Sequence, residues 1–472
     1  MKKIGLTGLC LLFAFTSLGA AGFDEDFTGA TLRIDYFHTG TAAEEHFALR
    51  RARIEGDWPG SRTRLIDDTN LGKYLIEIVD LGSNRTLHTR GFASIYGEWE
   101  TTGEARAGNW RAIPEAIRIP EPRRPFQLRV RKRAADQSFI EVWSRSFDPS
   151  SRFVDRAPID VGPAWAVQRK GDPAVKVDLV ILGDGYAADE MDRYHADVKR
   201  LTEDLFRYDP FAARRDDFNV WGVDSPATHS GISRPRAGVF RDSPLGARYN
   251  SFDSERYVLS MEDSAWRDVA AAAPYDFVLI LVNERKYGGG GIYGLYSTAA
   301  TGSSYAGYLV IHEFGHHFAG LGDEYYTSPV AYEEFGGALQ EPWEPNITAL
   351  GDPERLKWRD LVEEDTPLPT PWQKEDFEKH SRESQARRAE LRASGAAEEV
   401  LERLFDEERE HFTRTLKAEE HAGKVGAFEG AMYEAQGLYR PSADCIMFTR
   451  DDVGFCAVCR RAIERVIDLY TN

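Results

Sequence analysis

The sequence predicts a multidomain protein of mixed α+β and α/β architecture, with an N-terminal β-sandwich over residues 23–165 and an α/β domain over residues 166–472. Apolar and polar residues alternate up to about residue 165, which is typical of half-buried strands. Beyond about residue 175, continuous apolar runs alternate with helical periodicity. Residues 371–424 are dense in Glu, Arg, Lys and Ala, which predicts a charged helical insertion, solvated and without chemistry.

The composition indicates a globular chain without affinity for nucleic acid. Of 472 residues, 42% are hydrophobic, 12% aromatic and 29% charged, which is ordinary for a protein with a sizeable core. The formal net charge of −18 opposes binding to phosphate backbones, so we expect no nucleic-acid partner. After the first 22 residues no stretch approaches the roughly 18 uncharged apolar residues of a membrane helix, so we expect no stable membrane span.

Residues 1–22 have the pattern of a secretory signal peptide. Lys2 and Lys3 form a basic head, an apolar run extends from residue 4 to 15, and small residues follow up to Ala21. The apolar run is too short for a comfortable membrane span. We therefore expect the segment to be cleaved and the mature chain to be secreted or periplasmic.

Three runs of the N-terminal region predict strands that bury every second residue. They are Leu32, Ile34 and Tyr36; Tyr74, Ile76 and Ile78; and Phe126, Leu128 and Val130. Gly, Pro and Asn between the runs predict turns. Since no His, Asp and Glu cluster here at ligand spacing, we expect packing or surface contact from this domain.

The α/β domain is predicted to alternate buried strands with helices. The expected elements are a strand over Val177–Leu182, a helix through Phe206, and strands over Phe218–Val223 and Phe277–Val282. Four consecutive glycines at 288–291 lack the following Lys-Ser or Lys-Thr of a phosphate loop. We expect them to form a flexible turn that leads into a strand over Ile292–Thr298 bordering a cleft.

The stretch YLVIHEFGHHFAGLGDEYY, residues 308–326, has the spacing of a metal site. His312 and His316 are four residues apart, so a helix places both imidazoles on one face. Glu313 lies between them, where its carboxylate faces a water molecule rather than the metal. This pattern predicts metal-assisted hydrolysis.

A catalytic zinc site takes three protein ligands, so the sequence has to supply one more. On a straight helix Asp323 would lie about 16 Å beyond His312 along the axis. Gly320 can take the left-handed conformation that ends a helix, after which a short loop can return Asp323 to the ion. Asp323 is therefore the predicted third ligand, and Glu324 is the second choice.

Three cysteines lie in the last 28 residues. In an oxidising compartment we expect one disulfide, between Cys445 and either Cys456 or Cys459. A redox pair or half of a zinc ribbon is the alternative for Cys456 and Cys459. We weight it lower, because residues 455–470 have helical periodicity and no second Cys pair completes a four-sulfur site.

The motif HEFGHHFAGLGDEY resembles the zinc motif of the IgA-peptidase family (igalysins), secreted bacterial metalloendopeptidases of the metzincin type. Further matching stretches are SGISRPRAGVF, SFDSERY, VGAFEGAMYEAQGLYRPSADCIM and FCAVC, so that the resemblance extends from about residue 175 to 460. Metzincins usually place the glycine seven and the third ligand ten residues after the first ligand. Here Gly320 and Asp323 stand at eight and eleven, with the same step of three between them.

This resemblance implies a metzincin-like catalytic domain, with a twisted mixed sheet and an active-site helix, behind the N-terminal domain. It implies one catalytic Zn²⁺, Glu313 as general base, a methionine turn at Met447, and a protein or peptide substrate. Tyr433 and Tyr439 precede Met447, and either can donate a hydrogen bond to an oxyanion, although core packing explains both as well. No oligomeric state is implied.

Two alternative functions stay open from the residues alone. The chain can be a catalytically silent surface-binding or adhesion protein of the same fold, or a zinc hydrolase that acts on a non-peptide substrate. The presence of Glu313 disfavours the silent protein, because a site without turnover is free to lose its base. Only the family resemblance favours a peptide substrate.

Overall fold

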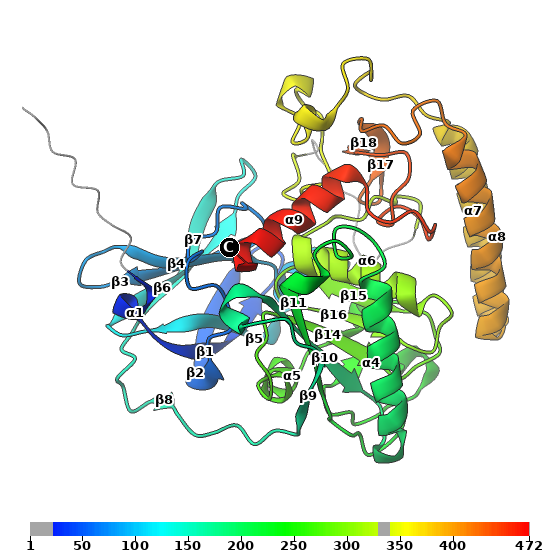
Figure 1. Ribbon diagram of the computed structural model, residues 1–472. Helices are drawn as coiled ribbons and strands as arrows, with labels where there is room; N and C mark the ends of the chain where they lie inside the picture. Colours follow the sequence, from blue (N-terminus) through cyan, green and yellow to red (C-terminus); the bar gives the residue numbers. More distant parts are fainter. Residues whose placement is uncertain (1–21, 329–339, 472) are drawn as a thin grey trace, which may run out of the picture.

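The structure, a computed structural model, describes residues 22–328 and 340–471. The predicted signal peptide therefore lies outside the described residues, except for Gly22. Two sets of strands form the body of the molecule, one from the N-terminal region and one from the middle of the chain (Figure 1). No helix in the described ranges has the length and apolar character needed to cross a membrane.

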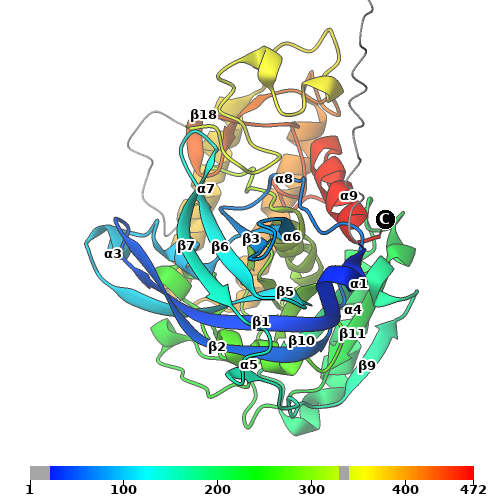
Figure 2. The same ribbon diagram turned by 90° about the vertical axis from the view of Figure 1, so that its left-hand side faces the viewer.

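The N-terminal region contains two four-stranded sheets (Figure 2). One has the order β5 (Arg111–Pro122), β1 (Phe27–Gly40), β2 (Glu45–Asp57), β8 (Val154–Asp155). The other has the order β4 (Thr86–Phe92), β3 (Tyr74–Asp80), β6 (Phe126–Arg133), β7 (Phe139–Phe147). All nine residues expected to point inward are buried, and they share one core between the sheets. The alternation therefore produces a sandwich.

Short helices complete this region. They are α1 (Phe23–Asp26), α2 (Ile95–Trp99) and α3 (Gly103–Arg106). The side chains of Ile95, Tyr96 and Trp99 belong to the same hydrophobic core as the second half of the chain. Arg33 on β1 also crosses the boundary, since its guanidinium donates to Asp268 at 2.5 Å. The N-terminal sandwich is thus packed firmly against the domain that follows it.

A six-stranded mixed sheet forms the centre of the second domain. Its order is β15 (Gly289–Ile292), β16 (Tyr296–Ala300), β14 (Phe277–Val282), β10 (Val177–Asp184), β11 (Phe218–Val223), β9 (Ala164–Gln168). The four inner strands are parallel and both edge strands are antiparallel to their neighbours. Because β9 belongs to this sheet, the second domain begins at about residue 164.

Helices pack around this sheet. They are α4 (Met191–Leu205), α5 (Asp263–Ala270), α6 (Ala306–Ala319) and α9 (Ala457–Thr471). Helix α6 packs against β15, β16, α4 and α9, which places it centrally (Figure 1). Two small hairpins, β12 (Ala247–Arg248) with β13 (Leu259–Ser260) and β17 (Phe428–Ala431) with β18 (Glu434–Arg440), lie outside the main sheet.

The glycine run at 288–291 differs from its prediction. It is not a flexible turn, because Gly289–Ile292 forms the edge strand β15. A Cβ on Gly291 would lie 2.1 Å from the carbonyl oxygen of Glu313, and one on Gly289 would lie 2.7 Å from the carbonyl oxygen of Thr298. Glycine is therefore required here by the close approach of backbones rather than by a turn.

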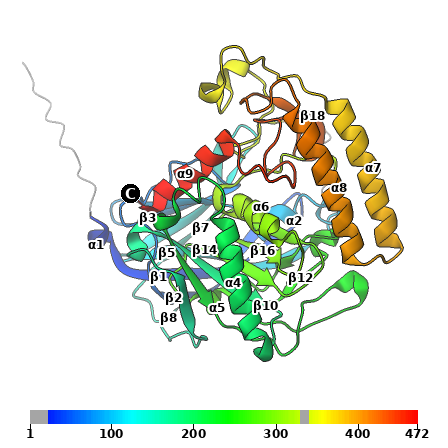
Figure 3. The same cartoon turned by 45° about the vertical axis from the view of Figure 1, so that its right-hand side comes forward.

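The charged insertion forms two antiparallel helices, α7 (Lys374–Ala393) and α8 (Glu398–Lys417), which lie side by side at one edge of the molecule (Figure 3). Most of their charged residues are exposed, as predicted. An apolar stripe fixes the pair to the body, since Phe377, Phe405 and Phe412 are buried in the main core. The insertion is therefore anchored rather than a freely projecting arm.

Candidate metal centre

Helix α6 carries the predicted metal-site residues. Its apolar side chains are buried in the main core, and Gly320 ends it in the left-handed conformation, with φ of 61°. His312 and His316 lie on the same face one turn apart, with their Nε2 atoms 3.1 Å from each other. The helix ending predicted from Gly320 is confirmed, and it turns the chain back toward the two histidines.

Asp323 is brought to both histidines by this turn. Its Oδ1 atom lies 3.1 Å from Nε2 of His312 and 3.2 Å from Nε2 of His316. The three atoms form a nearly equilateral triangle, close to the ligand separations of about 3.3 Å around a tetrahedral zinc ion. Although burial opposes it, the pKa of Asp323 is held well below its usual range by His316 and His312.

The outer nitrogens of the two imidazoles face carbonyl oxygens. Nδ1 of His312 lies 3.0 Å from the carbonyl oxygen of Ile446, and Nδ1 of His316 lies 2.5 Å from that of Leu321. A carbonyl can only accept, so each Nδ1 carries a proton, and in the neutral imidazole that a metal ion binds, each Nε2 presents a lone pair. Two lone pairs and a carboxylate oxygen then converge on one point, which is the donor set of a metal ion. The residues present therefore fit a metal.

Glu313 lies next to this group, in a cleft. The cleft has a volume of about 190 Å³ and is lined by His316, Asp323, Gly289 and Gly291 among others, which leaves room for water beside the carboxylate. Burial raises the pKa of Glu313, while His312 and His316 oppose the rise. A carboxylate with a raised pKa beside a metal group has the character of a proton acceptor.

Met447 lies directly beneath α6. It is fully buried, and its Sδ atom is 3.1 Å from the position that a Cβ on Gly315 would occupy. The preceding residue, Ile446, supplies the carbonyl that orients His312. The segment around Met447 therefore packs against α6 at Gly315 and orients the ring of His312.

Tyr433 is the one predicted oxyanion donor that reaches the cleft. It lies at the tip of the β17–β18 hairpin, where both Met432 and Tyr433 have positive φ, and its hydroxyl donates to Oδ2 of Asp323. Left-handed backbone at two successive non-glycine residues is strained, which requires support from neighbouring contacts. Backbone hydrogen bonds from this tip to residues 323 and 325 supply that support. Tyr439 pairs instead with Thr348 and is absent from the described lining of the cleft.

Two further side chains of the cleft were missed by the sequence analysis. Arg256 is half-buried and donates to the hydroxyl of Tyr325 at 2.8 Å, and that hydroxyl lies 3.3 Å from the hydroxyl of Tyr433. The stretch SFDSERY contains Arg256 and carried the family resemblance. That stretch was the sequence signal that pointed to Arg256. Nothing in its spacing relates it to the histidine motif about 60 residues later in the chain.

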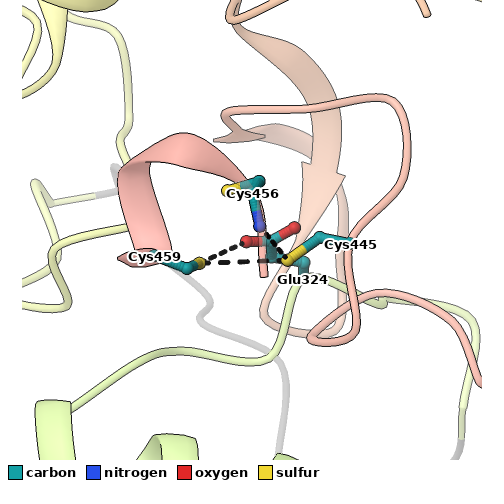
Figure 4. A group of neighbouring side chains, drawn as sticks. All are labelled: Glu324, Cys445, Cys456 and Cys459. Atoms are coloured by element: carbon teal, nitrogen blue, oxygen red, sulfur yellow. Dashed lines mark hydrogen bonds between the residues drawn. The ribbon is translucent and has the colours of Figure 1, made fainter. Parts of the chain in front are cut away.

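Glu324, the second choice for the third ligand, lies apart from the histidines. It is fully buried and its Oε1 atom is 3.3 Å from Sγ of Cys459 (Figure 4). The cysteines also differ from their prediction, because Cys445, Cys456 and Cys459 are free thiols in the structure and the expected disulfide is not formed. The sulfurs of Cys445 and Cys459 are 3.9 Å apart, since they converge with Glu324 on a common point instead of pairing.

His317, next to the second histidine, does not take part in the metal group. It is fully buried and its ring packs against Phe277 and Phe314. Burial lowers the pKa of His317 to about 3, so it stays neutral. Its role is packing.

Two histidines, an aspartate and an adjacent glutamate in a cleft beside a mixed sheet form the arrangement of metal-dependent hydrolases. Comparison with protein families identifies the particular group: residues 165–467 match the model of IgA Peptidase M64, and residues 22–144 match that of the Peptidase M64 N-terminus. The chain belongs to the IgA peptidase M64 family and is therefore a peptidase. The members of this family are metallopeptidases, and the described residues contain candidate metal-binding groups. No curated protein matches the chain.

Proposed function

We propose that this chain is a secreted zinc-dependent endopeptidase of the metzincin type that hydrolyses peptide bonds of protein substrates. The observation that carries the proposal is the triangle of His312, His316 and Asp323 beside Glu313. Two imidazoles and one carboxylate are a ligand set of catalytic zinc, which keeps a further position for water. The methionine turn is assigned to Met447.

Zinc bound by these three residues would lower the pKa of a water molecule to about 7 and polarise the scissile carbonyl. Glu313 takes the proton of the attacking water and returns it to the leaving amine. The raised pKa of Glu313 suits the first step, because it makes the carboxylate a stronger proton acceptor than an exposed glutamate.

Tyr433 and Arg256 also line the cleft. Tyr433 holds Oδ2 of Asp323, which leaves Oδ1 directed at the histidines. Arg256 brings a positive charge to the hydroxyls of Tyr325 and Tyr433, so that this side stabilises negative charge on a substrate oxygen. Glu313 and this hydroxyl pair thus divide proton transfer and charge stabilisation between them.

The substitution Glu313→Gln tests the proposal. It keeps the shape and the zinc ligands but removes the base, so we expect one catalytic zinc to remain while kcat/KM for casein falls by about 10²- to 10⁴-fold. Glu375→Gln, the same change on the exposed face of α7, is the matched control and keeps the wild-type rate. Full casein hydrolysis by Glu313→Gln contradicts the assigned base.

Metal removal separates the rival functions. Dialysis against a chelator is expected to abolish casein hydrolysis, and zinc is expected to restore it. A wild-type protein with zinc but no hydrolysis of any protein substrate favours a non-peptide substrate or a silent binding protein. Secretion depends on the pattern in residues 1–22, and N-terminal sequencing of the exported protein checks it.

A further inference from the structure

A second group of metal-binding side chains lies on the far side of the loop that carries Asp323. It consists of Cys445, Cys456, Cys459 and Glu324, whose sulfur and carboxylate oxygen atoms all lie within 4.8 Å of one another (Figure 4). Cys445, Cys459 and Glu324 have no solvent exposure. The group joins three separate segments, namely the loop after α6, the methionine turn and the start of α9.

The separations in this group match a metal ion better than a disulfide. Sγ of Cys445 and Sγ of Cys459 are 3.9 Å apart, and Sγ of Cys459 is 3.3 Å from Oε1 of Glu324. Tetrahedral zinc places two sulfurs about 3.8 Å apart and a sulfur and an oxygen about 3.5 Å apart. A disulfide requires about 2.05 Å between its sulfurs.

Glu324 provides an independent observation. Its Oε2 atom is buried and has no hydrogen-bond partner, whereas Oε1 accepts a hydrogen bond from Asn346 at 2.9 Å. A buried carboxylate oxygen without a partner is costly in a folded protein. A cation bound by this carboxylate and the three sulfurs would offset that cost, and Asn346 then orients the carboxylate as an outer-shell residue.

Two neighbouring groups bring positive charge to the sulfur atoms. The backbone N–H of Cys456 donates to Sγ of Cys445 at 3.4 Å, at the point where the 15-residue helix α9 begins. The N-terminus of a helix carries partial positive charge, which favours a thiolate. Arg440 is fully buried and interacts electrostatically with Glu324 and Cys445, so it offsets negative charge that the metal leaves over.

We propose that Cys445, Cys456, Cys459 and Glu324 bind a structural zinc ion, in addition to the catalytic ion of the proposed function. Three thiolates and one carboxylate close the tetrahedron, so this ion has no position for water or substrate. Binding releases the thiol protons to solvent and involves no oxidation. Borderline-soft zinc suits this mixture of sulfur and oxygen ligands, while Ca²⁺ and Mg²⁺ do not.

The second ion would hold the catalytic residues in place. Glu324 follows Asp323 directly, and its backbone N–H donates to the carbonyl oxygen of Met447 at 2.9 Å. Cys445 precedes Ile446, whose carbonyl orients His312. One ion therefore fixes both the loop of the third catalytic ligand and the turn beneath the histidines.

Metal content by mass spectrometry tests the inference on the full mature chain, purified without chelator. We expect two zinc ions per wild-type chain, one in Cys459→Ser and one in His316→Ala. The wild type can instead hold one ion. If His316→Ala still holds it and Cys459→Ser does not, the second site is supported and the proposed catalytic zinc is contradicted. If the wild type holds one ion that is still present in Cys459→Ser and absent from His316→Ala, the second site is overturned and the catalytic site is not.

Measurements on the wild-type protein cover the case in which Cys459→Ser does not fold. Titration with an organomercurial is expected to release one zinc per chain, and cobalt substitution is expected to give thiolate-to-cobalt charge-transfer absorption. Peptide mass spectrometry is expected to find all three cysteines alkylated after denaturation in chelator without reductant. A disulfide from Cys445 to Cys456 or Cys459, with no zinc released by the mercurial, overturns the inference.

Discussion

Gly291→Ala is the sharpest test of how the edge strand β15 shapes the cleft beside Glu313. A Cβ at this position would lie 2.1 Å from the carbonyl oxygen of Glu313 and 3.0 Å from Cβ of His316. Ordinary contact begins at 3.4 Å. The overlap involves backbone on both sides, so no side-chain rotation relieves it, and β15 and α6 have to separate by about 1.3 Å.

The size of the effect follows from this displacement. Misplacing reacting groups by about 1 Å costs about 100-fold in rate, and the moved helix carries both Glu313 and His316. We therefore expect kcat/KM for casein to fall about 100-fold. Because only one methyl group is added at the edge of the sheet, the protein is expected to stay folded, with a lowered Tm.

Casein hydrolysis, zinc content and thermal unfolding are measured on the same samples. Gly351→Ala is the matched control, because a Cβ there meets nothing within 4 Å and Gly351 lies in an exposed loop. It keeps the wild-type rate and Tm. If Gly291→Ala hydrolyses casein within twofold of wild type at unchanged Tm, the argument that glycine is required for the approach of β15 to α6 is refuted.

Two further predictions concern stability. Burial and Arg90 lower the pKa of His88 to about 3 in the folded protein. In the unfolded chain the pKa is near 6.5, so below that pH the unfolded chain binds a proton that the folded protein does not bind. The free energy of unfolding therefore falls as the pH decreases from 6.5 toward 3, by about 2 kcal/mol at pH 5. His88→Leu should remove this loss in urea unfolding at pH 7.5 and 5, and an unchanged pH dependence contradicts it. Met447→Ala should lower the free energy of unfolding by about 2–5 kcal/mol, because it leaves a cavity beneath Gly315. Met447→Leu, which nearly keeps the volume, should lower it by less than about 1.5 kcal/mol. Equal losses for the two variants in urea unfolding would refute specific packing at this position.

Local periodicity explains why much of the architecture was predictable. Strands β11 and β14 have the expected bounds, and the inward residues of β1, β3 and β6 are the expected ones. Burial of every second residue of a half-buried strand, or of every residue of a central one, appears directly in the order of the amino acids. The run of glycines gave no such signal, because its partner is the backbone of α6.

The arrangement of the candidate metal group was predictable for the same reason. His312, Glu313 and His316 are positioned by helical rotation alone, and Gly320 and Asp323 by the ending of that helix. Residues that reach the cleft from distant parts of the chain could not be predicted from local sequence patterns. Tyr433 is 110 residues from Asp323 in the chain, and Arg256 is 69 residues from Tyr325.

The pair Asp323 and Glu324 shows what the sequence determines and what only the tertiary structure decides. The sequence determined that an acidic residue returns to the histidines after Gly320, but it left two neighbouring carboxylates as candidates. The chain after α6 is not helical, and it directs the two neighbouring carboxylates to different groups. Asp323 therefore faces the histidines and Glu324 faces the cysteines more than 120 residues away. Only the packing of the turn around Met447 and of α9 against this loop decided which carboxylate belongs to which group. Those contacts join segments that are far apart in the chain, where no sequence periodicity relates them.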